Sequence, residues 1–191
     1  MPPRQLFPHN WPIPHIWLIS DARNDALLEA SLKRLPRGSG LIYRHYHLPD
    51  AARRARFERL ARIARSRGHL VILAGTAAEA RAWGADGAYG AARKLARGPR
   101  AIRLVTVHSL RELGKAQRAD AVLLSPVFPT RSHPGKGGMA GGAVLGAVRF
   151  LLLAHHSRVP VIALGGIDRA RACQLGAPRW AAIDGLIPKD S

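Results

Sequence analysis

Residues 159–168 read Val-Pro-Val-Ile-Ala-Leu-Gly-Gly-Ile-Asp. The apolar run 159–164 is typical of a buried β-strand, and Gly165 and Gly166 stand where that strand ends. Bare backbone N–H groups at paired glycines can approach a phosphate closely, although paired glycines elsewhere only turn the chain. The segment therefore predicts a buried strand with a candidate anion site at its carboxyl end.

Similar short apolar runs occur along the whole chain and alternate with amphipathic, helix-like stretches. This alternation predicts repeated βα units and a parallel sheet. The other apolar runs are 15–20, 40–47, 69–74, 86–89, 102–107, 121–127 and 180–183. The helix-like stretches are 24–35, 50–67, 76–83, a short basic segment after 89, 109–117 and 143–156.

About eight βα units in succession is the number that closes a parallel barrel. We therefore predict a compact α/β fold, a (β/α)8 TIM barrel with a shortened C-terminal end, because little chain follows Asp184. An open doubly wound sheet is the competing topology, but no glycine-rich turn follows the first strand. We expect one domain over 1–191, with 1–14 as an N-terminal extension.

Composition places the chain among ordinary folded proteins. Hydrophobic residues make up 47% and charged residues 22% of it. No apolar run approaches the roughly 18 residues that a membrane span needs, and no signal-peptide pattern opens the sequence. Cys173 is the single cysteine, which excludes an intramolecular disulfide. We expect a cytoplasmic protein with no membrane partner.

The formal net charge is +18, from 30 Lys and Arg against 12 Asp and Glu. Such a charge attracts polyanions at low salt, so non-specific association with nucleic acid is one hypothesis. No nucleic-acid-binding motif accompanies the charge, and solvated arginines on outer helices explain it as well. Nucleic acid is therefore not the expected partner, and the sequence leaves the oligomeric state open.

Two strand ends carry distinctive polar loops. Residues 124–136 run from a strand into a loop of hydroxyl, basic and glycine residues, which can wrap an anion. Gly165-Gly166 and Asp184-Gly185 follow the seventh and eighth predicted strands, where barrels of this kind often bind phosphate. The Gly185 N–H is thus a further candidate donor.

The stretch 119–130, Ala-Asp-Ala-Val-Leu-Leu-Ser-Pro-Val-Phe-Pro-Thr, followed by 160–167, Pro-Val-Ile-Ala-Leu-Gly-Gly-Ile, resembles the signature of the thiamine phosphate synthase family. Weaker similarities lie at 17–21, 85–90 and 105–109. The resemblance spans about residues 15 to 187. It implies a (β/α)8 barrel that joins a hydroxymethylpyrimidine diphosphate to a thiazole phosphate, with loss of diphosphate and help from magnesium.

The resemblance also implies roles for individual residues. Arg44 matches the arginine of the diphosphate clamp, His133 falls on a loop lysine of the family, and Lys136 is a possible substitute for that lysine. We take these three as the candidate catalytic residues. The candidate substrate- and phosphate-binding residues are Thr106, His108, Thr130, Ser132, Gly165, Gly166 and Gly185.

Other family positions differ here. Ile42 and Tyr46 replace a Gln and a Lys of the clamp, and neither 73–75 nor 89–94 contains the aspartates that bind magnesium in the family. A site without those carboxylates should hold magnesium poorly, so we assign no metal ligand. Arg44, Lys136 and two further cations, Arg93 and Lys94, could neutralise a diphosphate instead, unless the latter two lie on an outer helix face. A related thiazole tautomerase branch has a histidine where this chain has Pro126.

These features favour a thiamine phosphate synthase-like enzyme of thiamine biosynthesis. A barrel that binds or senses a phosphorylated heterocycle without coupling it is the alternative. Association with nucleic acid through the basic surface is the third hypothesis.

Overall fold

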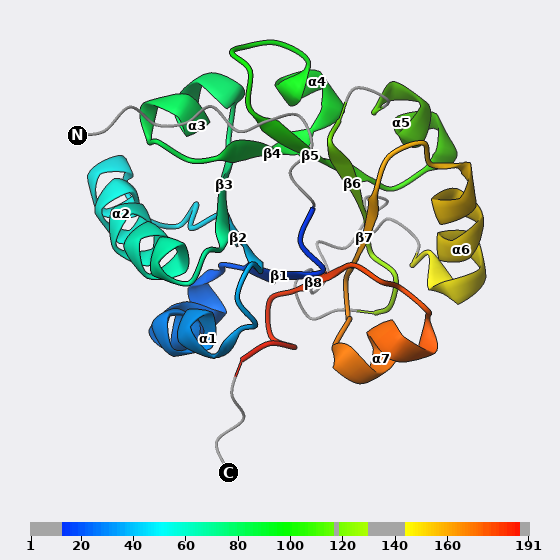
Figure 1. Cartoon of the computed structure of the whole chain (residues 1–191). Coiled ribbons are helices and arrows are strands. Elements are labelled where there is room, and N and C mark those ends of the chain that lie inside the picture. Colours follow the sequence, from blue (N-terminus) through cyan, green and yellow to red (C-terminus); the bar gives the residue numbers. More distant parts are fainter. Residues whose placement is uncertain (1–12, 117–118, 130–143, 188–191) are drawn as a thin grey trace.

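The computed structural model describes residues 13–116, 119–129 and 144–187. Eight parallel strands close into a barrel in chain order, and the last strand pairs with the first (Figure 1). The strands are β1 (Ile16–Ile19), β2 (Gly40–Tyr43), β3 (Leu70–Ala74), β4 (Gly87–Ala91), β5 (Ile102–Val107), β6 (Ala121–Leu124), β7 (Val161–Leu164) and β8 (Trp180–Ala182). The predicted (β/α)8 barrel is confirmed.

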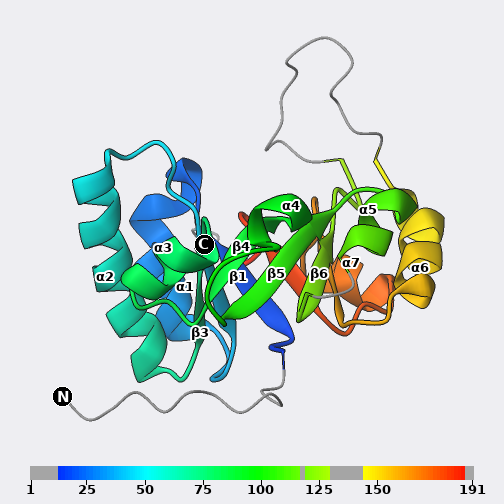
Figure 2. The same ribbon diagram turned by 90° about the horizontal axis from the view of Figure 1, so that it is seen from above.

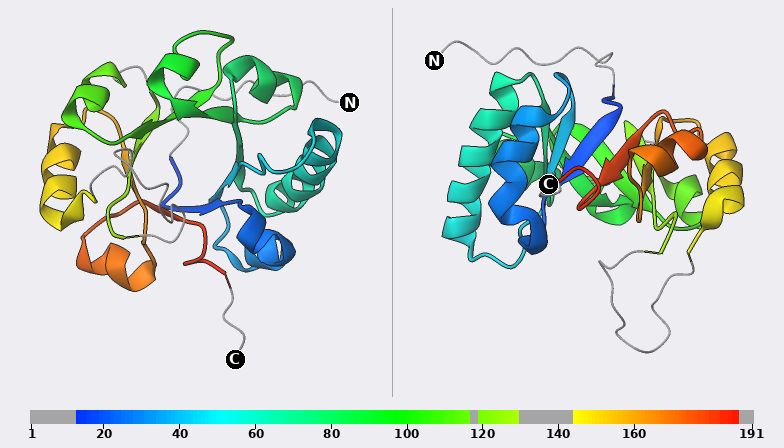
Figure 3. Two further views of the ribbon diagram at one scale, coloured as in Figure 1. Left: turned by 180° about the vertical axis from the view of Figure 1, so that it is seen from behind. Right: turned by 90° about the horizontal axis from the view of Figure 1, so that it is seen from below.

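Helices surround the barrel, as the views along and across its axis show (Figures 1 and 2). They are the 3-10 helix η1 (Ala22–Leu27), α1 (Leu28–Arg34), α2 (Asp50–Ser66), α3 (Ala77–Ala82), α4 (Ala92–Leu95), α5 (Leu110–Lys115), α6 (Gly146–His156) and α7 (Arg169–Gln174). After β8 the described residues 183–187 form no helix (Figure 3).

Alternate residues of each strand fill two separate apolar layers. Inside the barrel, side chains such as Trp17, Ile42, Ile72 and Leu104 pack against one another. The intervening side chains face the helices and form the larger outer core. Because successive strand residues point to opposite faces, this alternation also determines which residues beyond each strand end point toward the barrel axis.

Glycines in the strands make room for this packing. A Cβ atom on Gly87 would lie 2.3 Å from the Ile102 carbonyl oxygen, which belongs to the backbone of β5. We expect Gly87→Ala to lower the free energy of unfolding by about 1–3 kcal/mol, because β4 and β5 must move apart. Urea denaturation measures the loss. Gly114→Ala on α5 is the matched control: nothing lies within 4 Å there, so the same methyl should not destabilise the fold.

Several element boundaries differ from the sequence prediction. The strand expected at 40–47 ends at Tyr43, since His45 has a left-handed backbone with φ 40°. The helix expected at 24–35 begins as a 3-10 turn, and Leu27 is exposed rather than buried. In the described part of the chain, no helix is long and apolar enough to cross a membrane.

Two buried histidines make the stability of the fold sensitive to pH. Burial lowers the pKa of His45 and of His69, so the unfolded chain binds protons more readily than the folded one. The sign follows from linkage: the stabilisation is complete above the unfolded pKa of about 6.5 and is lost as pH falls toward the lowered folded pKa.

We therefore expect the free energy of unfolding to decrease between about pH 7 and pH 5. His69→Gln should reduce that pH dependence, whereas the same change at exposed His155 should preserve it. Denaturant titrations at several pH values provide the measurement. An unchanged slope in His69→Gln would contradict the assignment to His69.

Candidate functional site at the carboxyl ends of the strands

Parallel strands place all their carboxyl ends on one face of the barrel, where functional residues of such barrels gather. The residues that follow the strands at this face include Ser20, Arg44, His108, Ser125 and Gly165. We describe it in two parts. The glycine half comprises the ends of β5 to β8, and the arginine half comprises the ends of β1 to β4.

Gly165 and Gly166 follow β7 with positive φ angles of 99° and 60°. A Cβ on Gly165 would lie 2.7 Å from Pro126 Cα, and one on Gly166 would lie 2.6 Å from the Pro129 carbonyl oxygen. The segment after β6 thus packs directly on the glycines. This packing gives both glycines a structural requirement that is separate from any ligand.

The same glycines still offer donors. The Gly165 carbonyl accepts the Phe128 N–H at 3.0 Å, but no described residue accepts the N–H of Gly165 or of Gly166. A Cβ on Gly185 would lie 2.5 Å from the Ile167 carbonyl oxygen, so the turn after β8 touches the one after β7. The two turns that carry the predicted glycines are therefore in contact, as a phosphate site between these two strand ends requires.

His108 joins the ends of β5 and β6. Its Nδ1 lies 2.5 Å from the Ser125 carbonyl oxygen, which can only accept, so Nδ1 carries the proton and donates. Nε2 is then the nitrogen available to a ligand. Thr106 lies two residues earlier on β5, half-buried, and pairs in register with Leu123 of β6. The structure thus places both predicted residues beside the glycine half.

A chain of ion pairs links the residues that follow β1 to those that follow β8. Arg23 donates to Asp21 at 2.9 Å and to Asp184 at 3.2 Å. Burial alone would raise the pKa of Asp21, but the hydrogen bonds from Arg23 outweigh it and hold that pKa below its ordinary value. Asp21 also caps η1. Both carboxylates therefore have structural partners.

Arg44 is the central cation of the arginine half. It lies two residues beyond Ile42, which points into the barrel, and it is half-buried. Its guanidinium carbon lies 5.8 Å from the centre of the Tyr46 ring, and no described residue hydrogen-bonds to the guanidinium. The guanidinium therefore lies near an aromatic face, and its charge also helps to lower the pKa of Asp21. Its N–H donors remain available to an anion as far as the described residues are concerned.

Arg53 is a neighbour that sequence reasoning missed. It sits in the first turn of α2 and donates to the carbonyl oxygens of Arg44 at 2.8 Å and of Ala74 at 2.9 Å. Its guanidinium also lies over the rings of Tyr46 and Trp83. The signal was available, because the first turn of a helix that follows a strand starts at the functional face. Arg171 in the first turn of α7 is a parallel case, donating to the Gly166 carbonyl.

The positions where the family binds magnesium lack suitable ligands. Ala74 ends β3 and Gly75 follows it, and Ala92 to Lys94 follow β4 with only apolar and cationic side chains. The Glu79 carboxylate lies beside Gly75, but it already accepts the Thr76 N–H at 2.6 Å, and this bond lowers its pKa. Among the described residues no cluster of three or more His, Cys, Asp or Glu is present. This donor set does not fit magnesium.

Four predicted residues, Thr130, Ser132, His133 and Lys136, lie outside the described residues and stay predictions. Arg93 and Lys94 are both exposed on α4, and a Cβ on Gly90 would come within 3.8 Å of Lys94 Cδ. Lys94 therefore lies near the end of β4.

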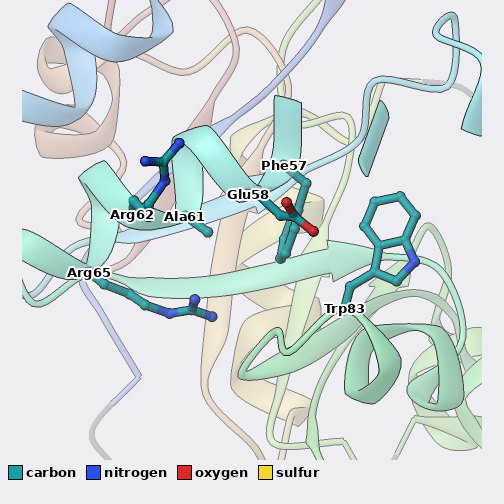
Figure 4. A pocket seen from close by; sticks show the side chains of 6 residues that line it. All are labelled: Phe57, Glu58, Ala61, Arg62, Arg65 and Trp83. Carbon is teal, nitrogen blue, oxygen red and sulfur yellow. The ribbon is translucent and has the colours of Figure 1, made fainter. Parts of the chain in front are cut away.

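A groove of about 320 Å³ also lies on the outer surface between α2 and α3 (Figure 4). It is lined by Phe57, Glu58, Ala61, Arg62, Arg65 and Trp83. These residues belong to the helix layer, and none of them follows a strand end. The groove is therefore separate from the candidate site.

The fold and this face define a class of protein: a closed (β/α)8 barrel with glycine turns after β7 and β8 and a half-buried arginine after β2. The family model for thiamine monophosphate synthase matches residues 16–186. The chain belongs to the thiamine monophosphate synthase family.

Individual relatives agree with this assignment. A thiamine-phosphate synthase of Anoxybacillus flavithermus is 40% identical over 87 residues, which cover 43% of this chain and 38% of the relative. The match thus spans well under half of that relative's length. Among solved structures, thiamine phosphate pyrophosphorylase from Pyrococcus furiosus has a TM-score of 0.71 at 21% identity, covering 90% of this chain and 85% of its own. The corresponding protein from Bacteroides thetaiotaomicron has a TM-score of 0.57 at 15% identity, covering 89% and 82%. Both structures share the fold.

Proposed function

We propose that this protein acts in thiamine biosynthesis by coupling hydroxymethylpyrimidine diphosphate with thiazole phosphate. The observation that carries the proposal is the family match over 16–186 together with the arrangement of the strand ends. On one half of the functional face lie backbone donors, and on the other a guanidinium, that form no hydrogen bond to a described residue. Two phosphorylated substrates that react with each other need two separate phosphate-binding regions on this face, one for each substrate.

The glycine half would hold the thiazole phosphate. The N–H groups of Gly165 and Gly166 have no described acceptor, and Gly185 lies against Ile167, the next residue of the same turn. Backbone donors in a glycine turn can surround phosphate oxygens without a side chain in the way. Holding this phosphate fixes the thiazole nitrogen in line with the carbon that it attacks.

The arginine half would hold the diphosphate that departs. Arg44 presents a fork of N–H donors that suits phosphate oxygens, and it bears a permanent positive charge. Negative charge grows on the diphosphate as its bond to the pyrimidine methylene breaks. Cations fixed beforehand near that position lower the barrier. Lys94 would add a second positive charge from the end of β4.

The decisive experiment mixes purified protein with both substrates and follows thiamine phosphate, once with magnesium and once with a chelator. We expect product in both, because the described donor set replaces metal carboxylates with cations. Loss of all product in chelator would instead show that magnesium is required. No product under either condition would exclude the synthase reaction.

A second candidate function is binding without turnover, as a carrier or sensor of thiazole phosphate. The absence of both family carboxylates from the described strand ends favours it. It predicts heat of binding for thiazole phosphate in calorimetry but no product. The absence of both heat and product would count against both functions. The cytoplasmic location stays a prediction from the sequence.

A further inference from the structure

A line of hydrogen bonds lies directly behind Arg44. The Arg44 backbone N–H donates to Ser20 Oγ at 2.8 Å, and Ser20 Oγ lies 2.8 Å from His45 Nδ1. On the other side of the ring, His45 Nε2 lies 2.8 Å from Asp25 Oδ1. Ser20 is fully buried and His45 almost fully. The line therefore runs from a surface carboxylate through the interior to the peptide that carries Arg44.

The partners determine where each proton resides. Burial alone would raise the pKa of Asp25, but hydrogen bonds from His45 and Arg56 lower it, so this carboxylate is ionised and only accepts. His45 Nε2 must then carry a proton. The Ser20 oxygen already accepts from Arg44, so its own proton needs an acceptor, and His45 Nδ1 is the one within reach. A neutral His45, protonated at Nε2, satisfies every group in the line.

This arrangement excludes one obvious alternative. Ser20, His45 and Asp25 have the residue types of a hydrolytic triad, in which the serine oxygen attacks a substrate. Here Ser20 has no exposed surface, and its oxygen is occupied by the Arg44 N–H. The serine thus transmits a hydrogen bond and does not act as a nucleophile.

The Arg44 peptide is fixed from both sides. Its N–H binds Ser20, and its carbonyl oxygen accepts from Arg53 Nε at 2.8 Å. His45 itself adopts φ 40°, an unusual conformation for a residue with a side chain, and stacks on Tyr43 with 4.8 Å between ring centres. A strained residue held by buried bonds at a strand end is typical of a position that orients a functional group.

We propose that His45 is a positioning residue for Arg44. Its neutral ring, protonated at Nε2 and anchored to Asp25, keeps the Ser20 hydroxyl on the Arg44 N–H and so fixes the direction in which the guanidinium meets an anion. The proposal rests on the function proposed above, in which Arg44 binds the departing diphosphate.

The first test needs no substrate. Nitrogen NMR of the imidazole should show His45 protonated at Nε2 and unprotonated at Nδ1, and the reverse tautomer would overturn the proposal.

Hydrogen exchange of the Arg44 backbone amide should be slow in the wild type and about tenfold faster in His45→Ala. His69→Ala removes another buried histidine, which lies just before the amino end of β3, at the other end of the barrel from Arg44. This variant should leave the Arg44 amide protected. Equal exchange at Arg44 in the wild type and in His45→Ala would also overturn it.

His45→Asn supplies a rescue. Asparagine tolerates a positive φ, and its amide oxygen can accept the Ser20 proton in place of Nδ1. We expect it to restore most of the Arg44 protection even though the Asp25 bond is lost. If His45→Ala fails to fold, this variant and the wild-type tautomer still decide the matter: an unprotected Arg44 amide in a folded His45→Asn would contradict the proposal.

The second test uses inorganic pyrophosphate in calorimetry and the coupling assay. His45→Ala should weaken pyrophosphate binding and lower kcat/KM by about tenfold to a hundredfold. In an Arg44→Ala background the same change should have no further effect, because the positioned group is gone. A full additional loss in that background would show that His45 acts independently of Arg44.

Wild-type protein that neither binds pyrophosphate nor forms product would overturn the proposed function. The amide-exchange data would still establish whether His45 holds the Arg44 peptide in place.

Discussion

Replacing Arg44 by alanine is expected to lower kcat/KM for the coupling reaction by about 10²–10³-fold. The guanidinium is half-buried at the end of β2 and has no described hydrogen-bond partner, so its charge is available to the substrate. For the same reason the fold should tolerate its loss, with a change in unfolding free energy of about 0.5 kcal/mol or less. Steady-state kinetics and urea denaturation measure the two effects.

Matched variants separate the role of Arg44 from general charge. Arg54→Ala removes an exposed arginine that pairs with Glu58 on the surface of α2, and it should leave the kinetics unchanged. Arg44→Lys keeps the charge but loses the planar fork, so its activity should lie between those of the wild type and Arg44→Ala. A wild-type rate in Arg44→Ala would remove Arg44 from the reaction.

The largest effect on stability is expected from Gly165→Ala. The new methyl group would lie 2.7 Å from Pro126 Cα, and the residue would have to adopt φ 99°. Left-handed strain and a backbone clash together should lower the unfolding free energy by about 3 kcal/mol or more. Urea denaturation of the variant against the wild type gives the value.

Gly176→Ala isolates the strain from the clash. Gly176 also has a positive φ, 64°, but nothing lies within 4 Å of the position its Cβ would take. We expect a loss of about 1–2 kcal/mol from the backbone conformation alone. Similar losses in both variants would mean that the segment after β6 does not press on Gly165 as the structure places it.

The two glycines after β7 combine a packing requirement with backbone donors that the proposed phosphate site would use. Their missing side chains let the segment after β6 approach, while their N–H groups remain without described acceptors. A substitution there would disturb the packing of the segment after β6 even if phosphate never bound. For this reason stability has to be measured beside binding in any glycine variant.

The order of elements could be predicted from the sequence because buried strands are short apolar runs and their helices are amphipathic. That pattern is local, because each strand and helix needs its own apolar residues to face the barrel interior or the layer between sheet and helices. Boundaries were less predictable: the strand expected at 40–47 stops at Tyr43, since its end is fixed by Ser20 and Arg53 from distant parts of the chain.

The candidate site divides in the same way. Arg44, His108, Gly165 and Gly166 could be found because each follows a strand, and a parallel barrel collects strand ends on one face. Arg53 and Arg171 could also have been found from their place in the first turns of α2 and α7. The Ser20–His45–Asp25 line could not, because it depends on contacts between elements. Nothing in the local sequence around His45 predicts that this side chain is buried, yet it is.

The sequence by itself determined the number and kind of structural units, the strand ends where chemistry can occur, and the missing carboxylates at the described magnesium positions. These properties depend on the spacing of residue types, which the chain carries in every conformation. Only the tertiary structure decided which arginines form hydrogen bonds to other described residues, which histidines are buried, and which glycines pack closely against a neighbouring segment. Hydrogen-bond partners, burial and the pKa values that follow from them arise only when residues far apart in the chain meet.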